Sequence, residues 1–391
     1  MDEIVIAGAK RTPIGKFQGI LNHLTAPQLG GSSIAGSLNH AEIDPERINE
    51  VYMGCVLPAG IGQAPARQAG IIGGLPKHTP ATTINKMCGS GMKAIMTGFD
   101  QLRLNQAEII VAGGMESMSQ APFYIPDARW GKRLGHTKIL DHMLTDGLTD
   151  AYDNNAHMGE FADDCAKEFG ITRKDQDDYA YESYVRALNA QVSGRTQNEI
   201  TPVFSSKGEA INQDEEPSKP NWERMANLRP SFKQMGTVTP ANSSKISDGA
   251  ASVVLGRASV LRKLGSPILA RIVGHDTFAQ EPKDFPTAPI YTVQNLLQKL
   301  SWKKEDVDLW EVNEAFAVVP LVFIRILEIP HEKINVNGGA CSLGHPIGCS
   351  GARIVTSLIH GMLNSKAKRG VAAVCIGGGE ATSVALEILS H

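Results

Sequence analysis

The stretch INKMCGSGMKAI (residues 84–95) joins an apolar run to a run of small residues at Cys88. The apolar lead-in is typical of a strand, and Gly89-Ser90-Gly91 opens a helical pattern. We therefore expect Cys88 to lie where a strand ends and a helix begins. Unpaired amides and the partial positive charge at a helix N-terminus favour a thiolate, which makes Cys88 a candidate nucleophile. Taken alone, a buried structural cysteine is the more common situation.

Two segments are echoed about 260 residues later in the chain. SGMKAI, from Ser90, matches SGARIV, from Ser350. AEIIVAGGMESMS, which contains Glu116, matches RGVAAVCIGGGEATS, which contains Glu380. Echoes at nearly one offset indicate a duplicated unit. Apolar β-branched runs alternate with helical patterns in each unit, which predicts two similar α/β halves built on parallel strands.

The region between the halves, from about 119 to 248, has a different composition. Aromatic, histidine, proline and charged residues increase, and INQDEEPSKPNWE is typical of a solvated loop. FADDCAKEFG and RKDQDDYAYESYVRALNAQ follow the pattern of two amphipathic helices, and Tyr179 and Tyr184 at helical spacing are expected to fill a core. We interpret this region as an insertion with a helical cap.

Composition excludes several classes of protein. A net charge of −3 and an isoelectric point near 6.4 do not support a nucleic-acid partner. The most apolar window, AFAVVPLVFI, is far shorter than the ~20 residues of a membrane span, and the start MDEIVIAG lacks the pattern of a secretory signal. Six cysteines without a CxxC pair favour reduced thiols, so we expect a cytoplasmic protein.

Three further residues are candidates for chemistry. His345 lies in the glycine-rich GGACSLGHPIGCSG (338–351), where an imidazole can activate a cysteine, although an isolated loop histidine is more often structural. Cys375 ends the apolar run VAAV beside a glycine turn, and Asn313 in VNEAFA can hold a water or an oxyanion. Cys341 and His345 form CxxxH without a second ligand pair, so we expect no metal site.

NKMCGSGMKA, GGMESMS, VNEAFA, GHPIGCSGAR and CIGGGE occur in this order, and together they resemble the motifs of the thiolases, in particular the acetyl-CoA acetyltransferases. The resemblance covers essentially the whole chain. It implies an α/β thiolase fold with a five-layered α/β/α/β/α core formed by two duplicated halves. The halves would be 1–118 with 249–271, and 272–391, and the insertion 119–248 would be a loop domain for coenzyme A (CoA) binding and oligomerisation.

The resemblance also implies roles for the candidate residues. Cys88 would be the nucleophile that accepts an acetyl group, His345 the base that activates it, and Cys375 the acid/base at the substrate α-carbon. Asn313, through a water, and His345 would stabilise the enolate oxygen. The backbone amides of Cys88 and Gly377 would form the second oxyanion hole.

The implied reaction is the reversible condensation of two acetyl-CoA molecules to acetoacetyl-CoA and CoA, through an acetyl-cysteine. CoA thioesters would be substrates, with no cofactor and no metal. Six residues resemble the pantetheine and acyl contacts: Leu148, His157, Met158, Phe232, Ser244 and Phe316. Lys219 is a candidate for the CoA phosphates by location, and Lys245 stands where glycine is usual in the family.

The resemblance further implies a homo-oligomer, either a dimer or a homotetramer formed by two dimers, with FYIPDARWGKRLGHTKIL (123–140) as the tetramer loop. A mobile surface excursion is the alternative for that loop. Two other functions stay open, namely a degradative 3-ketoacyl-CoA thiolase of broader chain length in fatty acid metabolism and a catalytically silent acyl-CoA or lipid-binding protein. A decarboxylating ketoacyl synthase is disfavoured by Cys375.

Overall fold

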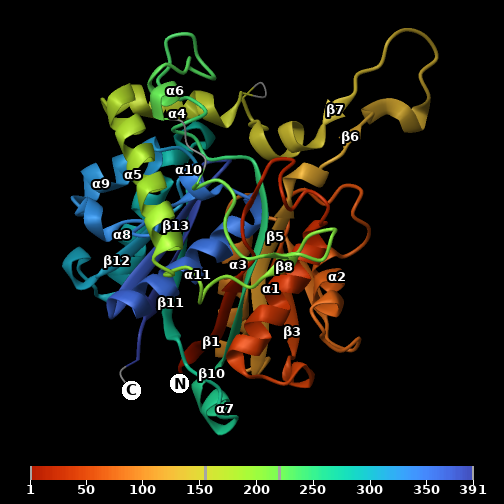
Figure 1. Ribbon diagram of the computed structural model, residues 1–391, viewed down its shortest axis with the longest axis vertical. Coiled ribbons are helices and arrows are strands. Elements are labelled where there is room, and N and C mark those ends of the chain that lie inside the picture. Colours follow the sequence, from red (N-terminus) through yellow and green to blue (C-terminus); the bar gives the residue numbers. More distant parts are fainter. Residues whose placement is uncertain (1, 154–155, 219–221, 390–391) are drawn as a thin grey trace.

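Two similar α/β halves and a helical cap build the protein, as the computed structural model of residues 2–153, 156–218 and 222–389 shows (Figure 1). The first half consists of β1 (Ile4–Arg11), β2 (Gly15–Lys16), α1 (Ala26–Ala41), η1 (Pro45–Arg47), β3 (Glu50–Gly54), α2 (Pro65–Ile72), β4 (Ala81–Ile84), α3 (Ser90–Arg103), β5 (Ile109–Ser117), β10 (Ser247–Arg257) and α7 (Ala258–Lys263). The second half consists of β11 (Ala270–Ala279), η5 (Pro282–Thr287), α8 (Ala288–Leu300), η6 (Lys304–Asp306), β12 (Leu309–Val312), α9 (Val318–Leu327), η7 (His331–Lys333), α10 (Ala340–Leu343), α11 (Ile347–Ser365), β13 (Arg369–Ile376) and β14 (Glu380–Glu387).

The strands follow the hydrogen-bonded order β12-β13-β14-β11-β1-β10-β5-β3-β4. The halves meet through a short pairing in which Val5 lies opposite Arg271 and Ile6 opposite Ala270. Outward from this junction, β1-β10-β5-β3 in one half and β11-β14-β13-β12 in the other have the same sequence of pairings: two antiparallel, then one parallel. This repetition confirms the duplicated unit.

The expectation of parallel strands is correct for part of each half. β3 pairs in parallel with β4 and β5, and β12 pairs in parallel with β13, each after a helical crossover. The other pairs are antiparallel, because β13 turns directly into β14 through Gly377–Gly379 and β10 enters after the insertion. Gly378 and Gly379 have φ of +92° and +84°, a conformation that favours glycine in so tight a turn.

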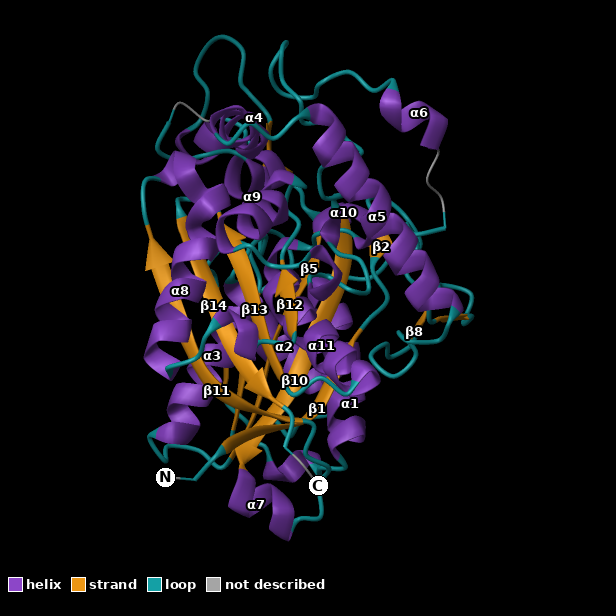
Figure 2. Cartoon of the chain, turned by 90° about the vertical axis from the view of Figure 1, so that its left-hand side faces the viewer, coloured by secondary structure: helices purple, strands orange, loops and turns teal. Residues whose placement is uncertain are grey.

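Helices and strands alternate in five layers, as predicted. α1 and α2 cover one face of the first half, α3 and α11 pack against each other between the two groups of strands, and α8 and α9 cover the far side (Figure 2). Three large apolar clusters fill the spaces between these layers. A Cβ on Gly91 would lie 2.8 Å from the Ala352 backbone nitrogen, so glycine permits the close contact of α3 with α11.

The structural repeat agrees with one of the two sequence echoes and only partly with the other. α3 corresponds to α11, β5 to β13 and β10 to β14, which fits the SGMKAI and SGARIV match. Glu116 lies near the end of β5, whereas Glu380 begins β14. The two glutamates are therefore not equivalent, and Glu380 instead forms an ion pair with Lys86 beside the Cys88 turn (2.6 Å).

The insertion contains the two predicted amphipathic helices and several short elements. The short elements are η2 (Met118–Gln120), β6 (Phe123–Tyr124), η3 (Pro126–Trp130), β7 (Leu140–Asp141), a π-helical turn (Leu144–Leu148), β8 (Val203–Phe204), β9 (Ala210–Ile211) and α6 (Trp222–Ala226). The helices are α4 (Met158–Glu168) and α5 (Arg173–Val192), each started by a capping box. Tyr179 and Tyr184 are buried, which confirms that they fill a core.

No helix in the described ranges is both long enough and apolar enough to cross a membrane.

Candidate active site

The turn that carries Cys88 is fixed where the two halves meet. Cys88 lies between β4 and α3, as predicted, and Met87 before it has a left-handed backbone with φ of +46°. The Ser90 hydroxyl donates to the Met87 carbonyl (2.6 Å) and holds this turn. A Cβ on Gly89 would lie 2.4 Å from the end of the Ile376 side chain of β13, so the turn packs closely against the second half. Strained backbone presents the thiol at the junction.

The environment of Cys88 differs from the expectation for a helix N-terminus. Burial raises the pKa of the Cys88 thiol to about 11, and the N–H groups of Gly377 and of Cys88 itself offset only part of that effect. Contrary to the prediction from the helix N-terminus, the pKa of Cys88 therefore lies above its ordinary value, because desolvation outweighs the amides. Those two amides nevertheless lie at the sulfur, where they can stabilise an oxyanion formed on an attached acyl group.

His345 is held as a neutral base. Its Nδ1 lies 2.5 Å from the Ser350 hydroxyl, which donates its own proton to the Pro346 carbonyl (3.0 Å). Nδ1 therefore carries the ring proton, and Nε2 presents a lone pair with no hydrogen-bond partner within the described residues. Burial, together with the charge of Arg353, lowers the pKa of His345 to about 3.

The backbone around His345 fixes where the ring lies. Gly344 has φ of +113°, and a Cβ there would lie 2.1 Å from the Ser247 hydroxyl oxygen. The N–H of His345 lies 2.9 Å from the Lys245 carbonyl and 2.9 Å from the Ser247 hydroxyl. The ring position is thus set by the segment that leads into β10.

Cys375 and Asn313 lie at the ends of the neighbouring strands β13 and β12. Cys375 is buried near the end of β13, and burial followed by the charge of Cys88 raises its pKa well above the ordinary thiol value. Asn313 follows β12 and donates its N–H to the Ala373 carbonyl (3.0 Å). Both polar atoms of its buried side chain lack a partner in the described part of the chain. A buried amide without partners is typical of a site that receives a polar ligand.

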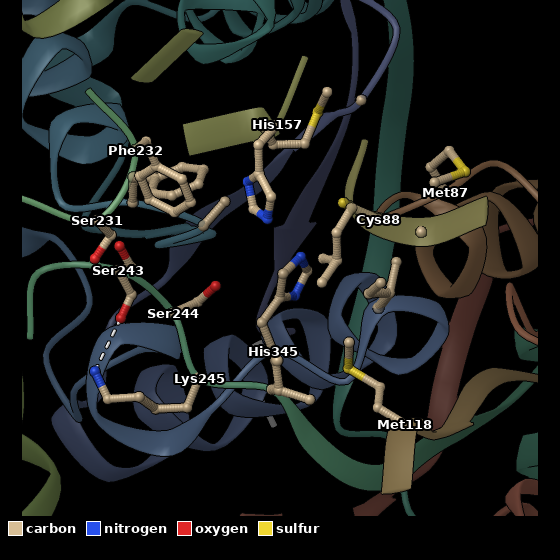
Figure 3. Close-up of a pocket in the computed structure, with 18 of the residues that line it drawn as sticks. Met87, Cys88, Met118, His157, Ser231, Phe232, Ser243, Ser244, Lys245 and His345 are labelled. Atoms are coloured by element: carbon tan, nitrogen blue, oxygen red, sulfur yellow. Dashed lines mark hydrogen bonds between the residues drawn. The ribbon is translucent and has the colours of Figure 1, made fainter. Parts of the chain in front are cut away.

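A cavity of about 260 Å³ lies beside Cys88 and His345 (Figure 3). Cys88, His345 and Gly377 line it. So do all six predicted substrate contacts: Leu148, His157, Met158, Phe232, Ser244 and Phe316. The structure therefore brings residues from both halves and from the insertion to one space. Cys375 and Asn313 are not among the residues that line it, although Cys375 is close enough to Cys88 to feel its charge.

The Nε2 atom of His157 is a hydrogen-bond donor, whereas the Nε2 atom of His345 is an acceptor. The Nδ1 atom of His157 accepts the N–H of Gly159 (3.2 Å), so Nε2 carries the ring proton. The ring packs on Phe232, with centroids 4.6 Å apart, and burial lowers the pKa of His157. Figure 3 shows both imidazoles and the Cys88 thiol directed toward the same space. One ring can donate to a substrate while the other accepts.

Two positioning residues were missed by sequence reasoning. Ser350 fixes the His345 tautomer. The sequence feature that could have indicated this role is a hydroxyl residue five positions after the histidine in GHPIGCSG. Glu116 was noted only as part of an echo. Its buried carboxylate accepts the N–H groups of Val56 (3.0 Å), Leu57 (3.1 Å) and Gly348 (2.8 Å), and so joins loops of both halves. The sequence feature that could have indicated this role is an acidic residue that follows an apolar run.

The remaining candidates are not placed in this cavity as ligands. Cys341 directs its thiol to the backbone carbonyls of Asn242 (3.7 Å) and Glu314 (3.8 Å). Across the described residues, no group of three or more His, Cys, Asp and Glu side chains could hold a metal ion. Lys219, the candidate for the CoA phosphates, lies outside the described residues.

Family models and known proteins match the chain over almost its full length. The thiolase N-terminal domain model matches residues 4–259, and the thiolase C-terminal domain model matches residues 266–388. A probable acetyl-CoA acetyltransferase of Dictyostelium discoideum is 46% identical over 393 residues, covering 100% of this chain and 95% of that protein. The acetyl-CoA acetyltransferase of Pseudomonas aeruginosa is 44% identical over 391 residues, covering 99% of each chain. The mitochondrial acetyl-CoA acetyltransferase of Homo sapiens is 46% identical over 394 residues, covering 100% of this chain and 91% of that protein.

A solved structure shares the whole architecture. The crystal structure of a thiolase from Ascaris suum in complex with coenzyme A superposes with a TM-score of 0.95 at 38% sequence identity. The superposition covers 99% of this chain and 100% of that chain.

Proposed function

Since this chain belongs to the thiolase family, we propose that it is an acetyl-CoA acetyltransferase, which condenses two acetyl-CoA molecules to acetoacetyl-CoA and CoA and catalyses the reverse thiolysis. One observation carries the proposal: Cys88 and His345 line one cavity, and the His345 Nε2 has no hydrogen-bond partner among the described residues. Cys375 is close enough to Cys88 for the charge of Cys88 to raise its pKa. The acyltransferase names of the relatives and the CoA bound to the Ascaris suum thiolase support the substrate class.

The first half-reaction transfers an acetyl group to Cys88. Nε2 of His345 takes the thiol proton as the sulfur attacks the thioester carbonyl, because a thiol with a raised pKa needs a base during attack. The N–H groups of Cys88 and Gly377 stabilise the oxyanion. The CoA thiolate leaves with the proton of Cys375. Acetyl-Cys88, CoA, an imidazolium and the Cys375 thiolate result, and the protons balance.

The second half-reaction forms the carbon–carbon bond. The Cys375 thiolate removes a proton from the methyl group of a second acetyl-CoA, and the imidazolium of His345 and Asn313, through a water, stabilise the enolate oxygen. The enolate carbon attacks acetyl-Cys88, the thioester bond to Cys88 breaks, and the Cys88 sulfur recovers its proton from His345. All three groups return to their starting states. CoA thioesters are the substrates, and these steps use protein groups without a cofactor.

A short acyl chain fits the proposal best. The HMG element at His157–Gly159 places His157 and Met158 in the cavity wall, and Phe285 and Phe316 line the same wall. The test is thiolysis of 3-ketoacyl-CoA substrates of increasing length, followed at the enolate absorbance. Highest kcat/KM with acetoacetyl-CoA supports the proposal. A maximum at long chains indicates a degradative thiolase, and no reaction with any chain length indicates a silent binding protein.

We also propose a homo-oligomer, with dimers joined in pairs by the excursion that carries β6 and β7. This segment projects from the body (Figure 1), and Trp130 and Leu134 near its tip are 89% and 92% exposed. Exposed apolar residues at a projecting tip suit a contact with another subunit. Sizing at several protein concentrations tests this proposal, and Trp130→Ser with Leu134→Ser is expected to convert tetramers to dimers.

We propose a cytoplasmic location because all six cysteines are free thiols. Relatives include mitochondrial proteins and a bacterial protein, so cell fractionation of the native host is the relevant measurement.

A further inference from the structure

The side chain of Lys245 folds back over its own turn beside the cavity. Its ammonium donates to the carbonyls of Pro240, Ala241 (3.4 Å) and Ser243 (3.0 Å), and the bond to Ser243 is drawn in Figure 3. The ammonium also lies 5.8 Å from the centroid of the Tyr184 ring. Lys245, Pro240 and Ser243 all line the cavity. The function described above assigns no role to this cation.

The three contacts suit the charged form of the side chain. An ammonium has three donors and no acceptor, and here three carbonyl oxygens meet it. A neutral amine would direct its lone pair at one of those oxygens. Burial lowers the pKa of Lys245, and the charges of Glu216 and Glu314 act against that effect. The turn is therefore organised around a positive charge.

The same turn forms one wall of the cavity. The Ser244 N–H donates to the Ala315 carbonyl (3.0 Å), and the Ala317 N–H donates to the Asn242 carbonyl (2.8 Å). Phe316, between these two contacts, lines the cavity together with Ser244. A shift of the turn would move both of these substrate-facing residues.

Lys245 also joins this wall to the proposed base. Its backbone carbonyl accepts the His345 N–H (2.9 Å) and the Ser247 hydroxyl (2.6 Å). One residue thus holds the substrate-lining turn with its side chain and the histidine with its backbone.

We propose that Lys245 is a positioning residue whose ammonium acts as a built-in cation, holding the turn 240–244 in place against the acyl-CoA substrate and His345. This inference rests on the proposed function. Because the backbone contact to His345 survives side-chain substitution, loss of the ammonium affects substrate binding more than the chemical step.

The test compares Lys245→Ala and Lys245→Met with Lys174→Ala, a control at an exposed lysine on α5. KM for acetoacetyl-CoA and the dissociation constant for CoA are each expected to rise about tenfold in both Lys245 variants, with kcat changed less than about threefold. The control is expected to match the wild type. Methionine preserves the bulk of the side chain, so Lys245→Met keeps the test available if the alanine variant does not fold.

Chemical rescue separates the charge from packing. n-Propylammonium replaces the atoms that Lys245→Ala removes, and it is expected to restore KM and CoA affinity in that variant, whereas 1-propanol, of similar shape but neutral, is not. Equal rescue of Lys245→Ala by both compounds would show that packing, and not the charge, is what the variant lacks. That result would overturn the role of the charge. If Lys245→Met binds CoA with the same affinity as the wild type, the role of the charge is likewise overturned.

Failure of this inference and failure of the proposed function give different results. An inactive wild type would contradict the function, and calorimetric CoA binding would still decide the role of Lys245. An active wild type with unaltered Lys245 variants would overturn the inference and leave the function standing.

Discussion

The Ser350 hydroxyl lies 2.5 Å from Nδ1 of His345 and donates its own proton to the Pro346 carbonyl at 3.0 Å. Because the hydroxyl proton is already used, Ser350 accepts the Nδ1–H and leaves the Nε2 lone pair toward Cys88. A serine on α11 thereby decides which nitrogen of the proposed base can take a proton.

Ser350→Ala is expected to lower kcat by about 10- to 100-fold, a part of the ~10²–10⁴ that a positioned general base contributes. The imidazole loses the acceptor that fixes its tautomer, while the cavity wall stays intact and KM changes little. Steady-state thiolysis of acetoacetyl-CoA measures the effect. Ser365→Ala, at the far end of the same helix, is the control and should retain wild-type turnover. Full activity in Ser350→Ala would show that the tautomer is fixed by other means.

Cys88→Ser is expected to abolish labelling of the protein by radioactive acetyl-CoA, because a serine hydroxyl is a far weaker nucleophile and leaving group in thioester exchange. The label is measured after denaturation and removal of free substrate. Cys165→Ala, at a buried thiol on α4, should label like the wild type. Label that persists in Cys88→Ser would place the nucleophile at another residue.

Cys375→Ala is expected to acquire acetyl label on Cys88 more slowly, because the leaving CoA thiolate loses its proton donor. It is expected to lose condensation by about 10²–10⁴-fold, the range for removal of an acid/base group. The α-proton of the second acetyl-CoA then loses the thiolate that is proposed to remove it. Label and acetoacetyl-CoA formation are measured on the same preparation. Equal loss of both would show that Cys375 acts in the first half-reaction alone, as the proton donor to the leaving CoA thiolate.

Asn313→Ala is expected to reduce turnover by about 10²-fold or more while the protein stays folded, as is typical when one oxyanion donor is removed. Its side-chain atoms make no hydrogen bond in the described structure, so their removal costs little folding energy. Turnover and thermal unfolding are measured together, with Asn364→Ala on the exposed end of α11 as the control. Undiminished turnover would remove Asn313 from the site.

The alkylation rate of Cys88 by iodoacetamide is expected to rise about tenfold per pH unit from pH 7 and to level near pH 11, because burial raises the thiol pKa to that value. Since the folded-state pKa is raised, this thiol stabilises the fold below about pH 9 and loses that contribution as the pH rises toward 11. Cys88→Ser provides the background rate. A plateau near pH 7 would instead indicate a preformed thiolate–imidazolium pair.

Local patterns in the chain predicted much of the fold and most of the residues of the candidate active site. The apolar run before Cys88 and the small residues after it predicted a strand-to-helix junction, because strand and helix periodicities are encoded within a few residues. The SGMKAI and SGARIV echo predicted two related halves, and motif order indicated the family and the residues that line the cavity.

Tertiary structure alone decided the electrostatics and the support of the site. Desolvation at the Cys88 turn raises the pKa of that thiol more than the nearby backbone amides lower it. The His345 tautomer depends on Ser350, and the wall beside it depends on three carbonyls converging on Lys245. Protonation states and hydrogen-bond directions follow from distances between segments remote in the chain, which no local pattern records.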